Sequence, residues 1–260
     1  MPPKKQPPPL TILVTNDDGV HAPGIRALAH ALGGLGDVFV LAPESEQSST
    51  SHALTLSRPL RLREHGVRVW SLDGTPADCT YVALHHRQFL PRPPTVVVSG
   101  INMGLNLGTD VFYSGTVAGA REAALRGFAA AAFSMPSAGD ARRCAARAKT
   151  MVARLLAWRA AHPSAAAPLL NVNFPNGAPR GVRVCTLGVR EYENVVEERR
   201  DPRGRQYLWI GGPSVAHRPN PGSDTAAHDE GYVSVTALRL DLALPGMQEA
   251  AQAVARRSPT

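Results

Sequence analysis

The residues whose chemistry is clearest are two adjacent carboxylates, Asp17 and Asp18, which follow a short apolar run. That run, Ile12–Thr15, predicts a strand buried on both faces, and such strands belong to parallel sheets. Neighbouring carboxylates repel unless a cation lies between them, and no lysine or arginine adjoins this pair. A divalent metal would balance both charges. The plainer alternative is an Asx turn, Asn16–Gly19, that caps the next helix, and these residues alone leave both interpretations open.

Two polar loops leave predicted strands at the same edge. The loop at residues 43–52, which contains Ser48, follows a strand predicted at Val38–Ala42. The stretch 100–110 follows a strand predicted at Thr95–Ser99, and its glycines and asparagines, Asn102 among them, indicate backbone close to a ligand. The carboxyl ends of parallel strands meet at one edge of a sheet, so these loops should converge on Asp17 and Asp18. All of these side chains offer oxygen ligands, which Mg²⁺ and Mn²⁺ prefer more than zinc does.

A helix is predicted to begin at Ser114 and to continue to Gly127. Ser114 is a favourable N-cap, and the free amides of the first turn, beside the hydroxyls of Ser114 and Thr116, form a natural phosphate cradle. A hard cation next to an anion-binding helix end is suited to phosphoryl chemistry.

Several motifs of other phosphate enzymes are missing from the sequence. There is no G-x-x-x-x-G-K-[ST] and no lysine near the glycine-rich stretch, which argues against a P-loop kinase or NTPase. No G-x-G-x-x-G follows the first strand, which argues against a dinucleotide-binding dehydrogenase. The aspartates are adjacent and do not form the Asp-x-Asp of aspartyl-nucleophile phosphatases. Attack by a metal-activated water is therefore favoured over a covalent intermediate.

Strands that alternate with helices predict an α/β fold, a Rossmann-like, doubly wound, mostly parallel sheet in three layers with right-handed crossovers. Short strands between residues 60 and 70 are interpreted as an antiparallel excursion. Near the C-terminus, Val195–Arg200 and Gln206–Ile210 predict a projecting β-hairpin around the turn at residues 201–204.

Length and composition fit a single globular domain. The chain has 260 residues, of which 43% are hydrophobic and 19% charged, and no apolar run approaches the length of a membrane span. Residues 1–9 read as a disordered Pro-rich tail without a signal core, and three scattered cysteines suit a reducing compartment, so we predict a cytoplasmic protein without membrane association. The net charge of +7 is compatible with an anionic partner.

In order along the chain, these motifs resemble the SurE family of stationary-phase survival proteins, which are metal-dependent nucleotidases. The resemblance covers nearly all of the chain except its first nine residues, as a single domain at 10–260 with a projecting arm at about 188–240. It is carried by Ile12–Gly19, Ala42–Pro43 with the loop to His52, Gly74–Cys79, Ser99–Asn102, Asn106–Asp110, Ser114–Val117, Asn171–Pro175 and Gly231–Thr236.

The resemblance implies one divalent cation per subunit, held by Asp17, Asp18, Ser48 and Asn102, with Ser49 as an alternative to Ser48. It implies phosphate contacts from Asn106, Ser114, Gly115 and Thr116. It implies hydrolysis of nucleoside 5′- and 3′-monophosphates and an exchange of the C-terminal β-hairpin arm between subunits, so we predict a homodimer or homotetramer. From their paired charges we also predict Asp17 and Asp18 as the catalytic residues. Met103 and Ser51 depart from the residues common in the family.

The competing hypothesis is a non-catalytic nucleotide- or nucleic-acid-binding Rossmann-like module. This hypothesis explains the positive net charge, but it assigns no role to the paired carboxylates of Asp17 and Asp18. Aromatic residues make up only 5% of the chain, and no surface that combines aromatic with basic residues is visible, which argues against single-strand binding. The arginines at positions 142, 143 and 147 are interpreted as a solvated helix face, so we predict no specific nucleic-acid partner.

Overall fold

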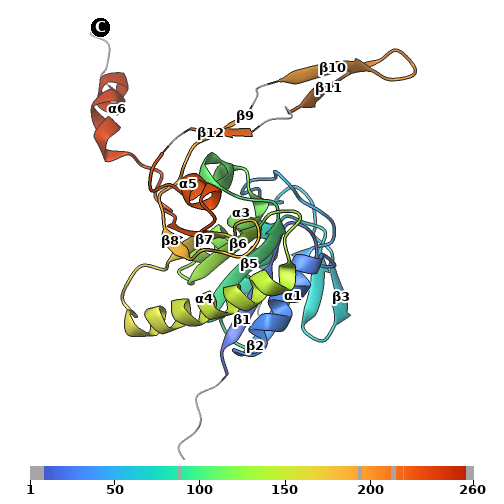
Figure 1. Ribbon diagram of the computed structural model, residues 1–260. Helices are drawn as coiled ribbons and strands as arrows, with labels where there is room; N and C mark the ends of the chain where they lie inside the picture. Colours follow the sequence, from blue (N-terminus) through green and yellow to red (C-terminus); the bar gives the residue numbers. More distant parts are fainter. Residues whose placement is uncertain (1–8, 87–88, 193–194, 212–214, 219, 256–260) are drawn as a thin grey trace, which may run out of the picture.

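The computed structural model describes residues 9–86, 89–192, 195–211, 215–218 and 220–255 (Figure 1). Of the predicted tail at residues 1–9, only Pro9 belongs to this part of the chain. No helix in the described ranges is long and apolar enough to cross a membrane.

A nine-stranded sheet forms the centre of the molecule, in the order β3-β4-β2-β1-β5-β6-β7-β13-β8. Neighbouring strands from β4 to β7 pair in parallel, β3 is antiparallel to β4, and β13 is antiparallel to β7. The mostly parallel sheet confirms the predicted fold class. Its strands are β1 Thr11–Thr15, β2 Asp37–Pro43, β3 Leu62–Gly66, β4 Val69–Leu72, β5 Val96–Met103, β6 Ala130–Met135, β7 Leu169–Asn173, β8 Val182–Val184 and β13 Val233–Ala237.

Helices cover both faces of the sheet, which makes the three layers. Helices α1 (Pro23–Leu32) and α4 (Ala141–Ala161) pack on one face, and α2 (Pro76–His85) and α3 (Gly115–Leu125) pack on the other. Each face has its own apolar core, because successive residues of a buried strand point to opposite sides: Ile12 and Val14 of β1 face α1, whereas Leu13 faces α2 and α3.

Capping side chains set the starts of α2 and α3, and the cap at Ser114 was predicted. Thr75 caps α2, and its side chain accepts from Asp78 N while the Asp78 carboxylate accepts from Thr75 N, which is a complete capping box with Pro76 at the first helical position. Ser114 caps α3 by accepting from Val117 N.

One crossover differs in hand from the rest. The connections β5–α3–β6 and β6–α4–β7 step across the sheet in the same direction, yet α3 and α4 lie on opposite faces. Because β1–α1–β2 and β4–α2–β5 share the hand of β5–α3–β6, the expectation of right-handed crossovers throughout is wrong for β6–α4–β7. On its face α4 packs with Ala131 and Phe133 of β6 in one apolar cluster.

The excursion predicted between residues 60 and 70 is only partly separate from the main sheet. Strands β3 and β4 are antiparallel to each other, but β4 also pairs in parallel with β2 and extends the sheet. The alternating sequence gave no sign of that second partner.

Between β8 and β13 the chain leaves the main sheet. Strand β9 (Arg190–Tyr192) pairs with β12 (Val215–His217), and β10 (Val196–Arg200) pairs with β11 (Gln206–Ile210) as a hairpin that projects from the body (Figure 1). We call residues 188–218 the arm. The remaining elements are short or terminal: η1 Gly108–Phe112, α5 Asp224–Asp229, η2 Pro245–Met247 and α6 Gln248–Ala255.

The order of strands fixes where a ligand can bind. The chain moves from β1 outward to β2 on one side, and from β5 outward to β6 on the other. Strands β1 and β5 are therefore the switch point of the sheet, and in open α/β sheets ligands bind beyond the carboxyl ends of the strands at that point. Asp17 and Asn102 lie there.

Candidate active site

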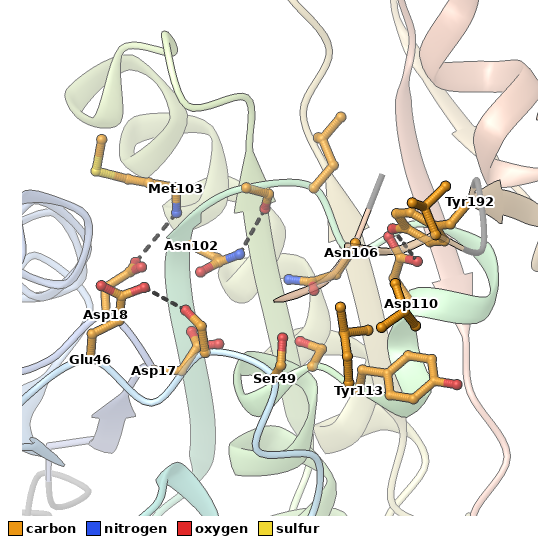
Figure 2. Close-up of a pocket in the computed structure, with 18 residues that line it drawn as sticks. Asp17, Asp18, Glu46, Ser49, Asn102, Met103, Asn106, Asp110, Tyr113 and Tyr192 are labelled. Carbon is orange, nitrogen blue, oxygen red and sulfur yellow. Dashed lines mark hydrogen bonds between the residues drawn. The ribbon is translucent and has the colours of Figure 1, made fainter. Parts of the chain in front are cut away.

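A cleft of about 700 Å³ opens beyond the ends of β1 and β5. Figure 2 shows its two ends, with Asp17 and Asp18 at one and Tyr192 of the arm at the other. The cleft is lined by Asp17, Asp18, Glu46, Ser48, Ser49, Asn102, Met103, Gly104, Leu105, Asn106, Asp110, Tyr113, Ser114, Tyr192, Val195, Val196, Ile210 and Gly211. It thus brings together the predicted metal ligands and two of the four predicted phosphate-binding residues, Asn106 and Ser114.

Among the carboxylates that line the cleft, Asp17 is the most buried, with 5% of its surface exposed. Burial raises the pKa of Asp17 to about 6, the negative charge of Asp18 adds to the increase, and hydrogen bonds from Thr116 oppose it. The Thr116 hydroxyl donates directly to Asp17 Oδ1. The hydrogen bond from Thr116 therefore fixes the orientation of the Asp17 carboxylate. Burial makes its charged form unfavourable in free energy, and a bound cation would offset that.

Asp18 and Glu46 add two more negative charges. The backbone N–H of Met103 donates to Asp18 Oδ2 at 3.3 Å, so β5 positions this carboxylate. Burial raises the pKa of Asp18, with a further increase from the negative charge of Glu46. Glu46 was not predicted as a site residue. Its place in a polar loop after a strand was the only signal.

This donor set fits a hard divalent cation. Four carboxylates line the cleft, with Asp17, Asp18 and Glu46 at one end and Asp110 at the other (Figure 2). No Lys, Arg or His is among the described residues that line it. Asn102 Nδ2 donates to the Gly104 carbonyl at 2.8 Å, which turns the amide oxygen of Asn102 toward the carboxylates (Figure 2). Oxygen donors and uncompensated negative charge are what Mg²⁺ and Mn²⁺ bind in proteins.

The serine loop, residues 44–52, is fastened to both strand β1 and helix α3. Gln47 N donates to the Asp17 carbonyl at 2.8 Å, and His52 Nε2 lies 2.9 Å from Glu122 Oε2, a buried carboxylate on α3. Ser48 donates to Glu46 Oε1 at 2.6 Å, which leaves its oxygen lone pairs for another partner. His52, which sequence alone could not assign, is thus an anchor of this loop.

Two serines of the same loop adopt the left-handed backbone conformation that favours glycine. Ser49 has a φ of 59° and Ser51 a φ of 55°. The Ser51 hydroxyl donates to the Phe112 carbonyl at 2.6 Å, which offsets part of the conformational cost of a serine at this position. The Ser49 hydroxyl points into the cleft (Figure 2).

The start of α3 faces Asp17. A methyl group on Gly115 would meet Asp17 Cβ at 2.9 Å and the Gln47 carbonyl at 3.2 Å, so only glycine fits here without displacement. Ser114 lines the cleft, whereas Thr116 is fully buried behind Asp17. The phosphate contact predicted for Thr116 stays a prediction; the contact that the structure shows is with Asp17.

Asn106 is held by the neighbouring strands. Its backbone N–H donates to Asn173 Oδ1 at 2.8 Å, and its Nδ2 lies 2.7 Å from Ser134 Oγ. Its carbonyl accepts from Asn171 and Asn173. Asn171 and Asn173 of β7 therefore fix one wall of the cleft.

The far wall comes from the arm and could not be placed from sequence. Tyr192, Val195 and Ile210 lie more than eighty residues from Asn106 in the chain, yet they share its cleft. The hairpin was predicted, but its position beside the site depends on tertiary contacts.

The raised pKa of Asp17 predicts a pH-dependent stability in the absence of metal. The Asp17 carboxyl loses its proton near pH 3.8 in the unfolded chain and near pH 6 in the folded chain. The protonated carboxyl therefore contributes to the free energy of unfolding in full below pH 3.8, and this contribution is lost as the pH rises through 6. The loss is about 3 kcal/mol, at about 1.4 kcal/mol per pKa unit. Denaturant unfolding in a chelator should show this loss in wild type and not in Asp17→Asn. Parallel pH profiles for the two proteins would contradict it.

Comparison with known proteins agrees with this geometry. The family model for Survival protein SurE matches residues 12–194. A protein of Sorangium cellulosum called 5′-nucleotidase SurE is 52% identical, covering 89% of this chain and 90% of the relative. A protein of Thermus thermophilus called 5′-nucleotidase SurE 1 is 43% identical, covering 93% and 96%. The crystal structure of the SurE protein from Aquifex aeolicus superposes with a TM-score of 0.80 at 35% identity, covering 95% of this chain and all of that one.

Fold and site together define a three-layer α/β protein with a carboxylate-lined cleft at the switch point of its sheet, opposite a helix N-terminus. Within that class, the chain belongs to the SurE family.

Proposed function

We propose that this protein is a divalent-cation-dependent phosphatase that hydrolyses nucleoside 5′-monophosphates, and 3′-monophosphates as well, to nucleoside and phosphate. The observation that carries the proposal is the position of the Asp17–Asp18 pair directly beside the first turn of α3, with Asp17, Asp18 and the helix cap Ser114 all lining one cleft. Relatives named 5′-nucleotidase SurE, which align over about nine-tenths of the chain, support it. No observation favours binding without turnover.

Asp17, Asp18, Asn102 and Ser48 would hold one cation, with the Ser49 hydroxyl close enough in the loop to replace Ser48. When bound, Mg²⁺ or Mn²⁺ lowers the pKa of water and neutralises charge on the phosphate. Thr116 keeps the Asp17 carboxylate oriented for this task, since its hydroxyl donates to Asp17 Oδ1.

The other residues act on the phosphate group. Ser114, with the first-turn amides of α3 at Gly115 and Thr116, stabilises the negative charge that grows on the phosphoryl oxygens in the transition state. Asn106, fixed by its bonds to β6 and β7, positions one phosphoryl oxygen. A water oxygen bonds to phosphorus as the bond from phosphorus to the ester oxygen breaks. Asp18 accepts a proton from the attacking water and passes it to the leaving ester oxygen.

The proposal is tested by the release of inorganic phosphate from a panel of nucleoside 5′- and 3′-monophosphates with several divalent ions. We expect release from the 5′-monophosphates, with a nucleoside formed for each phosphate. Tight binding of the same nucleotides without any phosphate release would favour a binding module instead.

We expect residues 10–260, including the arm, to form a single domain. We also expect a homodimer or homotetramer that assembles through the arm. The hairpin β10–β11 pairs only within itself among the described residues, and a lone two-stranded hairpin is marginally stable in water. It also exposes large apolar side chains, with Trp209 at 60% and Ile210 at 90%. Deleting residues 191–210 should give a monomer in analytical sedimentation. A deletion protein that sediments as the wild-type oligomer would contradict this assembly.

A cytoplasmic location completes the proposal. The cysteines at 79, 144 and 185 are all free, as expected in a reducing compartment.

A further inference from the structure

The cleft has a second half that the phosphate chemistry does not use. Beyond Asn106, away from Asp17 and Asp18, its walls are mostly apolar and aromatic, with the Asp110 carboxylate beside Tyr192 (Figure 2). This half, which we call the arm half, is lined by Tyr113 and by Tyr192, Val195, Val196 and Ile210 of the arm. A phosphate placed between Asp17 and Ser114 would direct the rest of an ester toward it.

The arm half presents exposed aromatic rings on which a nucleobase could stack. Tyr113 is 65% exposed and Tyr192 44% exposed, so both rings are open to a ligand. Aromatic side chains bind bases by stacking, whatever the base, because every base has a π-face.

Asp110 connects this half to the rest of the site. The Tyr192 hydroxyl donates to Asp110 Oδ1 at 2.7 Å, and Arg190 forms an ion pair with Asp110 Oδ2. Burial and the Asp110 charge raise the pKa of Tyr192 to about 12, so its hydroxyl stays a donor at neutral pH. The Asp110 carbonyl accepts from Ser114 N at 3.0 Å. One residue therefore holds both the arm's aromatic ring and the cap of the phosphate-binding helix.

A second link ties the same segments together without touching the cleft. Asp224 is fully buried and accepts from Gly108 N at 2.8 Å and Gly188 N at 2.7 Å. It brings the base of the arm against η1 even when the Asp110 side chain is removed, so changes at Asp110 should act on the cleft and leave the fold intact.

We propose that Asp110 is a positioning residue for substrate selectivity, which holds Tyr192 and the base of the arm so that the enzyme prefers phosphate esters carrying a nucleobase over esters without one. This inference rests on the proposed function and deepens it. It assigns the nucleoside to the arm half and makes the preference depend on the Asp110–Tyr192 hydrogen bond.

The test compares two substrates that differ only in the base, adenosine 5′-monophosphate and ribose 5-phosphate. In Asp110→Ala and Tyr192→Phe, the ratio of kcat/KM for the nucleotide to that for the sugar phosphate should fall about tenfold, within the range of base–aromatic stacking, and chiefly through KM. Tyr192→Phe keeps the ring and removes only the hydroxyl that binds Asp110. Tyr207→Phe makes the same change on β11 outside the cleft and should keep the wild-type ratio.

An unchanged ratio in both variants, or equal losses on both substrates, would overturn the role of Asp110. Wild type that hydrolyses ribose 5-phosphate as efficiently as the nucleotide would overturn the assignment of the arm half while leaving phosphatase activity in place. Wild type that hydrolyses neither ester would instead disprove the proposed function, and the inference with it.

Discussion

Asp17→Asn is expected to reduce phosphate release by at least about a hundredfold, the scale of losing one key electrostatic group. The substitution keeps the size of the side chain and its acceptor oxygen for Thr116, but it removes one negative charge from the cation site. Cation affinity should fall together with turnover.

The same variant should be at least as stable as wild type in a chelator at neutral pH. Burial makes the charged form of Asp17 costly in the folded protein, and an amide does not carry that cost. A variant that is stable, inactive and unable to bind a cation would separate the chemical role of Asp17 from a structural one. Wild-type turnover in Asp17→Asn would place the site elsewhere.

Gly115→Ala is expected to have an effect of similar size without removing any functional group. The added methyl would lie 2.9 Å from Asp17 Cβ and 3.1 Å from Asp17 Oδ2, and neither atom can move freely because Thr116 holds the carboxylate. The methyl also meets the Gln47 carbonyl, so the serine loop and β1 would be pushed away from α3. Misplacement of catalytic groups by about 1 Å costs on the order of a hundredfold in rate.

Gly33→Ala is the matched control for this substitution. Gly33 lies at the end of α1 with a negative φ, and a methyl there meets the nearest atom, the His30 carbonyl, at an ordinary 3.4 Å. Its phosphate release should match wild type. Full activity in Gly115→Ala would show that the close approach of α3 to Asp17 does not matter for the reaction.

The predictions from sequence were strongest where the determinant is local. A run of β-branched residues and a capping residue such as Ser114 each act over a few residues, and β1 and α3 were placed within a residue or two at their starts. Because parallel strands present their carboxyl ends at one edge, the meeting of Asp17, Asp18 and Asn102 also followed from the pattern.

What sequence could not provide depends on contacts between distant segments. The pairing of β4 with β2, the hand of the β6–α4–β7 crossover and the arrival of Tyr192 in the cleft leave no local periodic signal. The role of Thr116 is a subtler case. Its position in the first turn predicts a phosphate contact, which stays a prediction, and the close packing allowed by Gly115 brings its hydroxyl onto Asp17, a contact that sequence did not indicate.

The most direct measurement of the central claim is the rate of phosphate release from a nucleoside 5′-monophosphate as Mn²⁺ is titrated into chelator-treated wild type. The carboxylates of the cleft have no other counter-charge among its described lining residues, so the treated protein should be inactive. The rate should rise with added cation and level off at one per subunit. Full phosphate release after exhaustive chelation, or none at any cation concentration, would contradict a metal-dependent nucleotidase site at Asp17 and Asp18.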